Sequence, residues 1–375
     1  MEIDFETQVL EARTEVTFLP REETRLVVFE LHNGLNLGRV EAADGSEVPA
    51  VRYRQDFTIR LNFYDTLPVG EPVRVTFFYD GRLQGTEDSP VEGVSLASIE
   101  PDRALLLYPG RWFPVNGYGA DRFAATISVT TAGGYHVVAS GLPTRAFAED
   151  GREKKKFTFD RPSFPGSVAV LPDEPLRVDG RSGSIDVYLH SVDEELRMAY
   201  GDAAGSFVEF FTDKFGAPYT TSLAVVAMGE SAPTGYSAPG IIFLSPFGIG
   251  QEVNRHLLGT QVAHQWWRAM VSPGNRNHTW LDLGLASYSS ALQVEEEEGD
   301  NDPIEPVNRA IFEFNEWVTK LVVRPLATGY RWLLPDPARD SVENVMDNLN
   351  SPRILANDLF QGELVRAWHT ASRFV

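Results

Sequence analysis

The chain has 375 residues, of which 43% are hydrophobic, and it carries a formal net charge of −20. This length exceeds what one hydrophobic core usually spans, so we expect two domains. The negative charge argues against nucleic acid or an anionic membrane as a partner, and the absence of cysteine excludes disulfides and thiolate metal sites.

No membrane-directing segment stands out in the sequence. The N-terminus lacks the basic and apolar regions of a signal peptide, and no run of about 18 apolar residues predicts a membrane span. We therefore expect a soluble protein with no signal peptide or transmembrane segment in this chain. Its compartment is left open.

The first half of the chain has the period-two pattern of β-strands. Residues 57–63 and 73–79 alternate between apolar and polar side chains, and Asp80-Gly81 is a turn dipeptide. Further strands are expected at 124–130, 135–139, 157–160, 168–171 and 185–189. Short strands at this spacing predict an antiparallel β-sandwich or saddle over residues 1–184.

The pattern changes to helical spacing near residue 190. Ser191 and Glu194 form a capping box, and Phe215-Gly216 supplies a stop signal, so a helix is expected between them. A strand should follow at 223–228, then helices at 253–270, 284–294 and 307–321. We place the domain boundary near residue 184 and predict an α+β protein whose second domain, 185–375, is mostly helical.

Two segments of the second half share the spacing of a zinc site. The first is Thr260-Gln261-Val262-Ala263-His264-Gln265-Trp266, and the second is Trp280-Leu281-Asp282-Leu283-Gly284-Leu285-Ala286. They resemble the H-E-x-x-H-x-W and W-L-N-E-G-F-A helices of the membrane alanyl aminopeptidase family, the gluzincin zinc metallopeptidases. In that family two His residues four apart and a Glu nineteen positions later bind Zn²⁺, and the first Glu is the general base. The segment from Arg111-Trp112-Phe113-Pro114 to Phe123 also resembles a segment of that family's N-terminal domain.

The resemblance implies a thermolysin-like second domain, shortened at its C-terminal end, in which the catalytic residues are missing. Thr260, His264 and Leu283 occupy the positions of the three zinc ligands, and Gln261 occupies that of the base. Only His264 is a zinc ligand type, because leucine has no lone pair and threonine seldom ligates zinc; glutamine cannot accept a proton.

Two further family positions are also altered. Ser237 stands where active members carry the Glu that binds the substrate's α-amine, and Leu359 stands where they carry the Tyr that stabilises the oxyanion. The resemblance thus implies a catalytically inactive aminopeptidase-like protein, a pseudopeptidase, with no zinc and no other cofactor. Its partner would be a peptide or another protein.

Two enzymatic alternatives remain open. In one, Ser237 within Gly235-Tyr236-Ser237-Ala238-Pro239 acts as a nucleophile with His264 and Asp282, which are the residue types of a catalytic triad. In the other, Glu252, His256 or Asp282 refills the zinc position. Either would make the protein a hydrolase with an altered active site.

Overall fold

The structure is a computed structural model, and it describes residues 1–298 apart from 85–88, 90–92, 117–120, 150, 274–277 and 279. The chain divides into two units, Met1–Glu298 and Gly299–Val375. All described residues belong to the first unit. The predicted helix at 307–321 and Leu359 lie outside the described residues. The predicted boundary near residue 184 falls inside the first unit.

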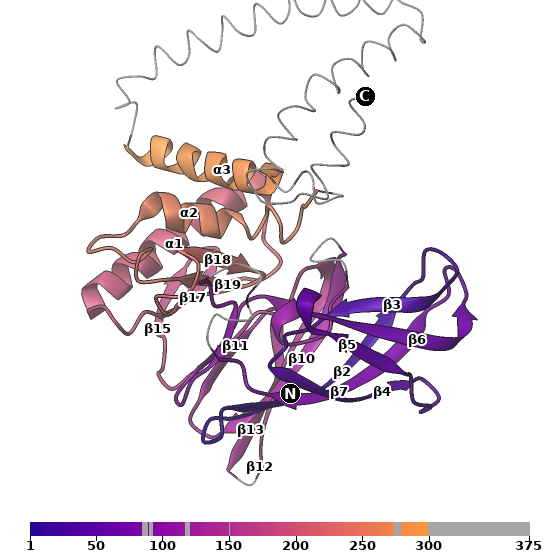
Figure 1. Ribbon diagram of the computed structural model, residues 1–375. Helices are drawn as coiled ribbons and strands as arrows, with labels where there is room; N and C mark the ends of the chain where they lie inside the picture. The colour runs from indigo at the N-terminus through magenta and orange to yellow at the C-terminus, as the bar shows by residue number, and fades with distance from the viewer. Residues whose placement is uncertain are drawn as a thin grey trace, which may run out of the picture. The chain divides into compact units, whose positions relative to one another are not determined.

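The first half, in which apolar and polar residues alternate along the strands, forms three sheets (Figure 1). The strands of the seven-stranded sheet, in spatial order, are β12 (Leu142–Glu149), β13 (Arg152–Ser163), β10 (Phe123–Ala132), β1 (Glu2–Asp4), β2 (Val9–Phe18), β7 (Val73–Gly81) and β4 (Leu35–Ala42). The three-stranded sheet contains β3 (Thr24–Glu30), β6 (Thr58–Leu67) and β5 (Ala50–Tyr53). The four-stranded sheet contains β11 (His136–Ala139), β14 (Val168–Leu171), β9 (Ala104–Leu106) and β8 (Ala97–Ile99).

One core joins these three sheets, because each sends apolar side chains into the same buried cluster. Phe77 of β7, Phe29 of β3 and Leu106 of β9 are all within it. Two 3₁₀ turns, η1 (Arg54–Asp56) and η2 (Pro109–Arg111), lie in the connections. The prediction of an all-β N-terminal half is confirmed.

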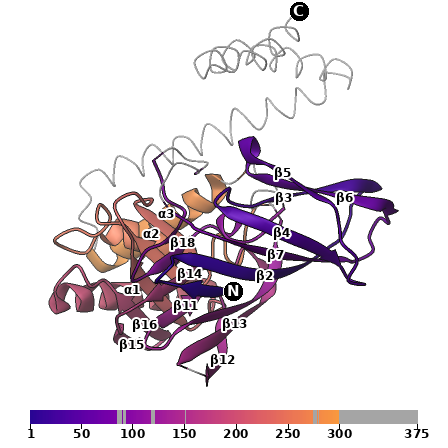
Figure 2. The same ribbon diagram turned by 60° about the horizontal axis from the view of Figure 1, so that its bottom comes forward.

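The second half is built on a five-stranded mixed sheet. Its order is β15 (Leu176–Gly180), β16 (Gly183–Tyr188), β17 (Ser222–Ala227), β19 (Ile241–Leu244) and β18 (Gly235–Ala238). Three helices accompany it, α1 (Glu194–Phe215), α2 (Arg255–Ala263) and α3 (Trp280–Glu298). The helices lie together at one end of the unit, and β3, β5 and β6 lie at the other (Figure 1, Figure 2).

Both faces of the five-stranded sheet are covered. Leu223 and Val225 of β17 belong to the core shared with the helices, whereas Ala224 and Val226 belong to a third cluster shared with Leu105 of β9 and its neighbours. A strand buried on both faces is apolar at consecutive positions, as in the run 223–226. This third cluster connects the helical half to the four-stranded sheet.

Three predictions for this half need correction. The expectation of a mostly helical domain is not supported by the described residues, because a five-stranded sheet accompanies the three helices and the whole described chain is mostly β. The first helix begins after Asp193, whose carboxylate accepts a hydrogen bond from the N–H of Leu196, and not after Ser191. The helix expected at 253–270 ends at Ala263.

The helix α2 gives way to turns after its early end. Residues 264–271 fold into turns in which the N–H of Ala269 donates to the carbonyl of His264 and the N–H of Arg268 donates to the carbonyl of Val271. Arg268 has a φ of 109°, a left-handed conformation that no helix residue adopts. Trp266, which lies within these turns, is buried in the core of the helical half.

Candidate functional site

The predicted zinc position lies on α2, and its residues on this helix are buried. Asn254 caps the helix by accepting a hydrogen bond from the N–H of Leu257. Thr260, Gln261 and His264 are all buried, and the N–H of His264 donates to the carbonyl of Thr260 at 3.2 Å. Thr260 and His264 are therefore one turn apart on the same face, as the spacing predicts. The Thr260 hydroxyl has no hydrogen-bond partner among the described residues.

His264 is held as a neutral imidazole. Its Nδ1–H donates to the carbonyl of Trp267 at 3.0 Å, which leaves Nε2 as the unprotonated nitrogen. The side chain is only 4% exposed. Burial, reinforced by the nearby Arg268 guanidinium, lowers the pKa of His264 from 6.5 to about 4. A backbone carbonyl on Nδ1 is an arrangement common in zinc-binding histidines, but here it belongs to a lone imidazole.

Ser237 is a bridge between β18 and α2. Its hydroxyl donates to the carbonyl of Gln261 at 2.9 Å and accepts from Nε2 of Gln265 at 2.9 Å. Gln265 also accepts from the N–H of Gly240 at 2.8 Å. Because the serine proton is used by a backbone carbonyl, it is not shared with His264, which the nucleophile hypothesis requires.

In the second segment, the side chain at the third ligand position and the side chain before it differ in their exposure. Leu283 on α3 is 55% exposed, whereas its neighbour Asp282 is 5% exposed and lies 3.9 Å from Nε of Arg268. Burial raises the pKa of Asp282, while Arg268 and Arg122 lower it. The leucine at the third ligand position is thus exposed to solvent, and the neighbouring carboxylate is buried and paired with arginine.

The refilled metal site has no geometric counterpart in the described part of the chain. Glu252 and His256 are exposed, whereas Asp282 is buried on α3. Within residues 1–298 and outside the stated gaps, no three His, Cys, Asp or Glu side chains are grouped as a metal ion would require. Leu359, the predicted oxyanion position, lies outside the described residues.

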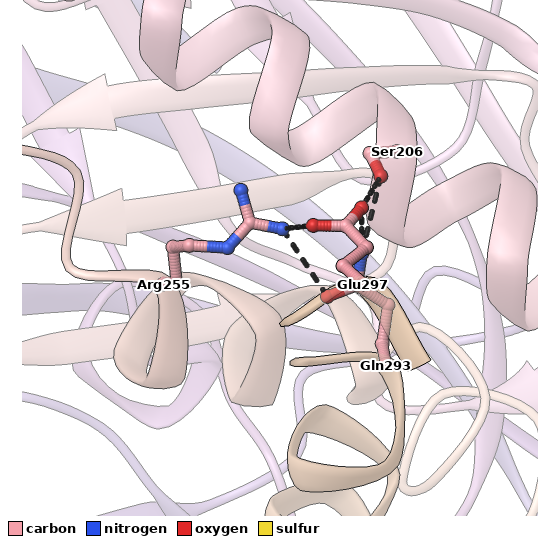
Figure 3. A network of polar contacts seen from close by, with 4 residues as sticks. All are labelled: Ser206, Arg255, Gln293 and Glu297. Atoms are coloured by element: carbon pink, nitrogen blue, oxygen red, sulfur yellow. Dashed lines mark hydrogen bonds and ion pairs between the residues drawn. The ribbon is translucent and has the colours of Figure 1, made fainter. Parts of the chain in front are cut away.

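The three helices are fastened to one another by polar contacts that sequence analysis missed. Figure 3 shows Ser206 of α1, Arg255 of α2, and Gln293 and Glu297 of α3 in one network. Ser206 donates to Glu297 at 2.5 Å, Arg255 pairs with Glu297, and Arg255 also donates to Gln293 at 3.3 Å. Residues 295–298 are the end of α3. The i,i+4 spacing of Gln293 and Glu297 was the available signal.

At the middle of α3, the indole N–H of Trp267 donates to the hydroxyl of Ser289 at 2.8 Å. Gly259 allows the closest approach of the helices, because a Cβ there would overlap the Phe207 ring and the Ser290 hydroxyl. None of these contacts involves the three zinc-ligand positions.

Comparison with solved structures identifies the fold of the first unit. An M1 zinc metallopeptidase from Deinococcus radiodurans superposes with a TM-score of 0.63 at 20% identity, over 78% of this chain and 68% of that one. A structure of a mutant of the same enzyme bound to a Tyr-Ser-Ala substrate gives a TM-score of 0.64 at 19% identity, over 86% and 73%. The fold is therefore that of M1 metallopeptidases, and identities this low carry no activity with them.

Comparison with known sequences gives a different family for the end of the chain. The family model of the MlaA lipoproteins matches residues 300–375. The Escherichia coli protein named "Intermembrane phospholipid transport system lipoprotein MlaA" is 32% identical over 97 residues, which is 26% of this chain and 37% of that protein. The Haemophilus influenzae protein of the same name is 30% identical over 92 residues, or 24% and 36%. The chain thus spans little more than a third of the length of these relatives.

These matches overturn three expectations. The prediction of a catalytically inactive aminopeptidase-like protein that binds a peptide is contradicted, as is its alternative of a hydrolase with an altered site, because the sequence relatives are phospholipid-transport lipoproteins. The expectation of a soluble protein is contradicted because these relatives are lipoproteins. Among the described residues, no helix is both long and apolar enough to cross a membrane.

Proposed function

We propose that this protein takes part in the transport of phospholipids between membranes and that residues 300–375 carry this function. Two observations support the proposal: the family model of the MlaA lipoproteins matches residues 300–375, and the Escherichia coli protein is 32% identical to this chain over 97 residues. The name of these relatives describes a lipoprotein of an intermembrane phospholipid transport system. We therefore extend the proposal to work at a membrane surface with at least one protein partner.

In this proposal the M1-like unit holds no zinc and performs no metal-dependent chemistry. Of the three ligand positions, Thr260 has a buried hydroxyl, Leu283 is exposed, and only His264 carries a ligand nitrogen. One imidazole does not supply the affinity that three convergent ligands give. Metal analysis of the purified protein tests this part, and one zinc ion per chain would overturn it.

Phospholipid transfer between vesicles tests the main proposal. Donor vesicles carry a fluorescent phospholipid with a quencher, acceptor vesicles carry neither, and the full chain should accelerate the appearance of fluorescence. A chain with Leu333→Asp and Leu334→Asp, which breaks an apolar run of residues 300–375, should lose the acceleration. The matched control, Gln261→Ala on α2, should keep it.

Two results would contradict the proposal. One is a full chain that does not accelerate transfer and contains no phospholipid when its extract is analysed by mass spectrometry. The other is transfer that the paired Asp substitutions leave unchanged while Gln261→Ala abolishes it, since the function would then belong to the M1-like unit.

A further inference from the structure

The three-stranded sheet, at the end of the unit away from the helices, has a second apolar face that is exposed (Figure 1). The strand register fixes which residues share this face, since Val28 lies opposite Arg60 and Arg60 lies opposite Val51. Val27 and Phe29 of β3 are buried in the core, so the residues that alternate with them point away from it. Five large apolar residues are exposed there, and we call this set the outer sheet face: Leu26, Val28, Val51, Tyr53 and Tyr64.

The outer sheet face differs from the solvent side of an ordinary antiparallel sheet, which is polar. Residues 26–29 are apolar at consecutive positions, which is the pattern of the strand run 223–226, where both faces are covered. Tyr64 follows Phe63, which packs against the core, and is itself 77% exposed. With typical side-chain areas, the outer sheet face presents on the order of 500 Å² to solvent, the size at which patches on monomers are commonly functional.

One end of the outer sheet face is acidic. Glu22, Glu23 and Asp65 lie where β3 begins and β6 ends, and all three are exposed. Two arginines are near them in sequence. Arg25 donates to a threonine hydroxyl of β6 at 3.1 Å, and Arg21 lies 3.7 Å from an aspartate outside the sheet. The three carboxylates therefore outnumber Arg25, while Arg21 is balanced by its own aspartate.

The other end of the outer sheet face is basic. Arg54 directly follows β5 and is exposed. Arg60 lies two residues into β6, with its guanidinium carbon 3.8 Å from the centroid of the Tyr53 ring. Asp56 lies 3.3 Å from Arg60 and offsets one of these two positive charges. Glu30, at the same end, is buried and paired with an arginine. This end therefore keeps a positive excess.

The charges make the outer sheet face complementary to itself. A two-fold axis that lies between two such faces and runs across the strands places the acidic end of one copy over the basic end of the other. Two-fold dimers are the commonest oligomers, and sheets often pack face to face with their strands nearly aligned. Two copies would bury about 1,000 Å² in total, which is the lower limit for a specific interface and indicates a weak dimer.

We propose that the outer sheet face is the interface of a weak, two-fold symmetric homodimer, in which the acidic end of each copy lies over the basic end of the other. This proposal is independent of the function proposed for residues 300–375. Sedimentation velocity of the full chain tests it at concentrations from about 1 to 200 µM, the range in which an interface of this size should form. Leu26→Ser together with Tyr64→Ser should weaken dimerisation about tenfold or more, because apolar area is lost from both copies.

Charge reversal provides a sharper test. The first variant carries Glu22→Arg and Glu23→Arg, and the second carries Arg54→Glu and Arg60→Glu. Each variant alone should dimerise about tenfold more weakly or worse, because like charges then face each other at both contacts. An equimolar mixture of the two should dimerise again, since every basic end of the first variant then meets an acidic end of the second.

The matched control is Glu11→Arg with Glu15→Arg on β2, where both residues are exposed on the seven-stranded sheet. It changes the net charge of the chain as much as the first variant does, and it should not weaken dimerisation. A loss in the first variant but not in this control therefore reports the contact and not the overall charge. Circular dichroism and the urea midpoint of each variant confirm that the fold is kept.

Three outcomes would overturn the inference. The full chain remains monomeric over the whole range; the paired serine substitutions leave its dimerisation unchanged; or mixing the two charge-reversed variants restores nothing. Because the chain has no cysteine, Tyr64→Cys with a soluble maleimide then identifies what occupies the face instead. A monomer whose thiol is shielded in buffer has the face covered by another part of the chain, and one whose thiol becomes shielded only with phosphatidylcholine vesicles has it covered by a bilayer.

Discussion

The neutral, buried His264 predicts a specific loss of stability as the pH falls. Its pKa is about 4 in the folded chain against 6.5 in its ordinary state. The unfolded chain therefore binds more protons than the folded chain between these two pH values. A group whose folded pKa is depressed stabilises the fold above the unfolded pKa and loses that contribution as the pH falls through the window.

The size of the effect follows from the shift. A difference of 6.5 − 4 = 2.5 pH units corresponds to about 3 kcal/mol when the pH is below both values. Between pH 7.5 and pH 5.0, most of that change has already occurred, and His264 alone should lower the free energy of unfolding by about 2 kcal/mol. The side chain is 4% exposed, so solvent screening does not reduce the estimate much.

The measurement compares the parent with His264→Gln by urea unfolding, followed by tryptophan fluorescence, at pH 7.5 and at pH 5.0. The glutamine amide can still donate to the carbonyl of Trp267 but does not titrate, so the variant should lose about 2 kcal/mol less than the parent on acidification. His190→Gln is the comparison variant. Burial lowers the pKa of His190 too, but its side chain is 31% exposed, so the slope should change less. Parallel pH profiles for the parent and His264→Gln would refute the reasoning.

Two further predictions concern the helices that surround this histidine. Gly259→Ala should destabilise the fold by about 1–3 kcal/mol because its Cβ would overlap side chains of α1 and α3. Gly205→Ala on α1, with no atom near the added Cβ, should stabilise the fold by about 0.5–1 kcal/mol. Equal urea midpoints for the two variants would contradict this prediction. A chain with Thr260→His, Gln261→Glu and Leu283→Glu should bind zinc in isothermal titration calorimetry, while the parent should not. A heat of zinc binding measured for the parent would count against a metal-free site.

The strands of the first half could be predicted well because burial alternates with period two. Residues 168–171 were predicted to form a strand and form β14 with the same bounds. Residues 73–79 were predicted correctly, but the strand continues through Asp80-Gly81, which sequence analysis had assigned to a turn. Pairing with both β2 and β4 holds these two residues in the sheet. Local turn propensity was overridden by neighbours that are distant in sequence.

The candidate site could be predicted only in part. The spacing of four correctly placed Thr260 and His264 on one helix face, since that depends on the local helix period alone. The end of α2 at Ala263 could not be predicted, because Trp266 and Trp267 are fixed by the carbonyl of Gly216 and the hydroxyl of Ser289, far away in sequence. The exposure of Leu283 depends on the same packing of α3.

The stability of this helix packing explains how an M1-like fold can exist without a metal-ligand set. A metal site stabilises a fold when its ligands hold elements together that do not otherwise pack. Here α2 and α3 are joined by the close approach at Gly259, by the bond from Trp267 to Ser289 and by the pairing of Arg255 with Glu297. None of these contacts uses Thr260, His264 or Leu283, the three positions of the zinc ligands. The zinc-site motif therefore corresponds to the fold, and the function has to be sought where other features of the chain, such as residues 300–375, point to it.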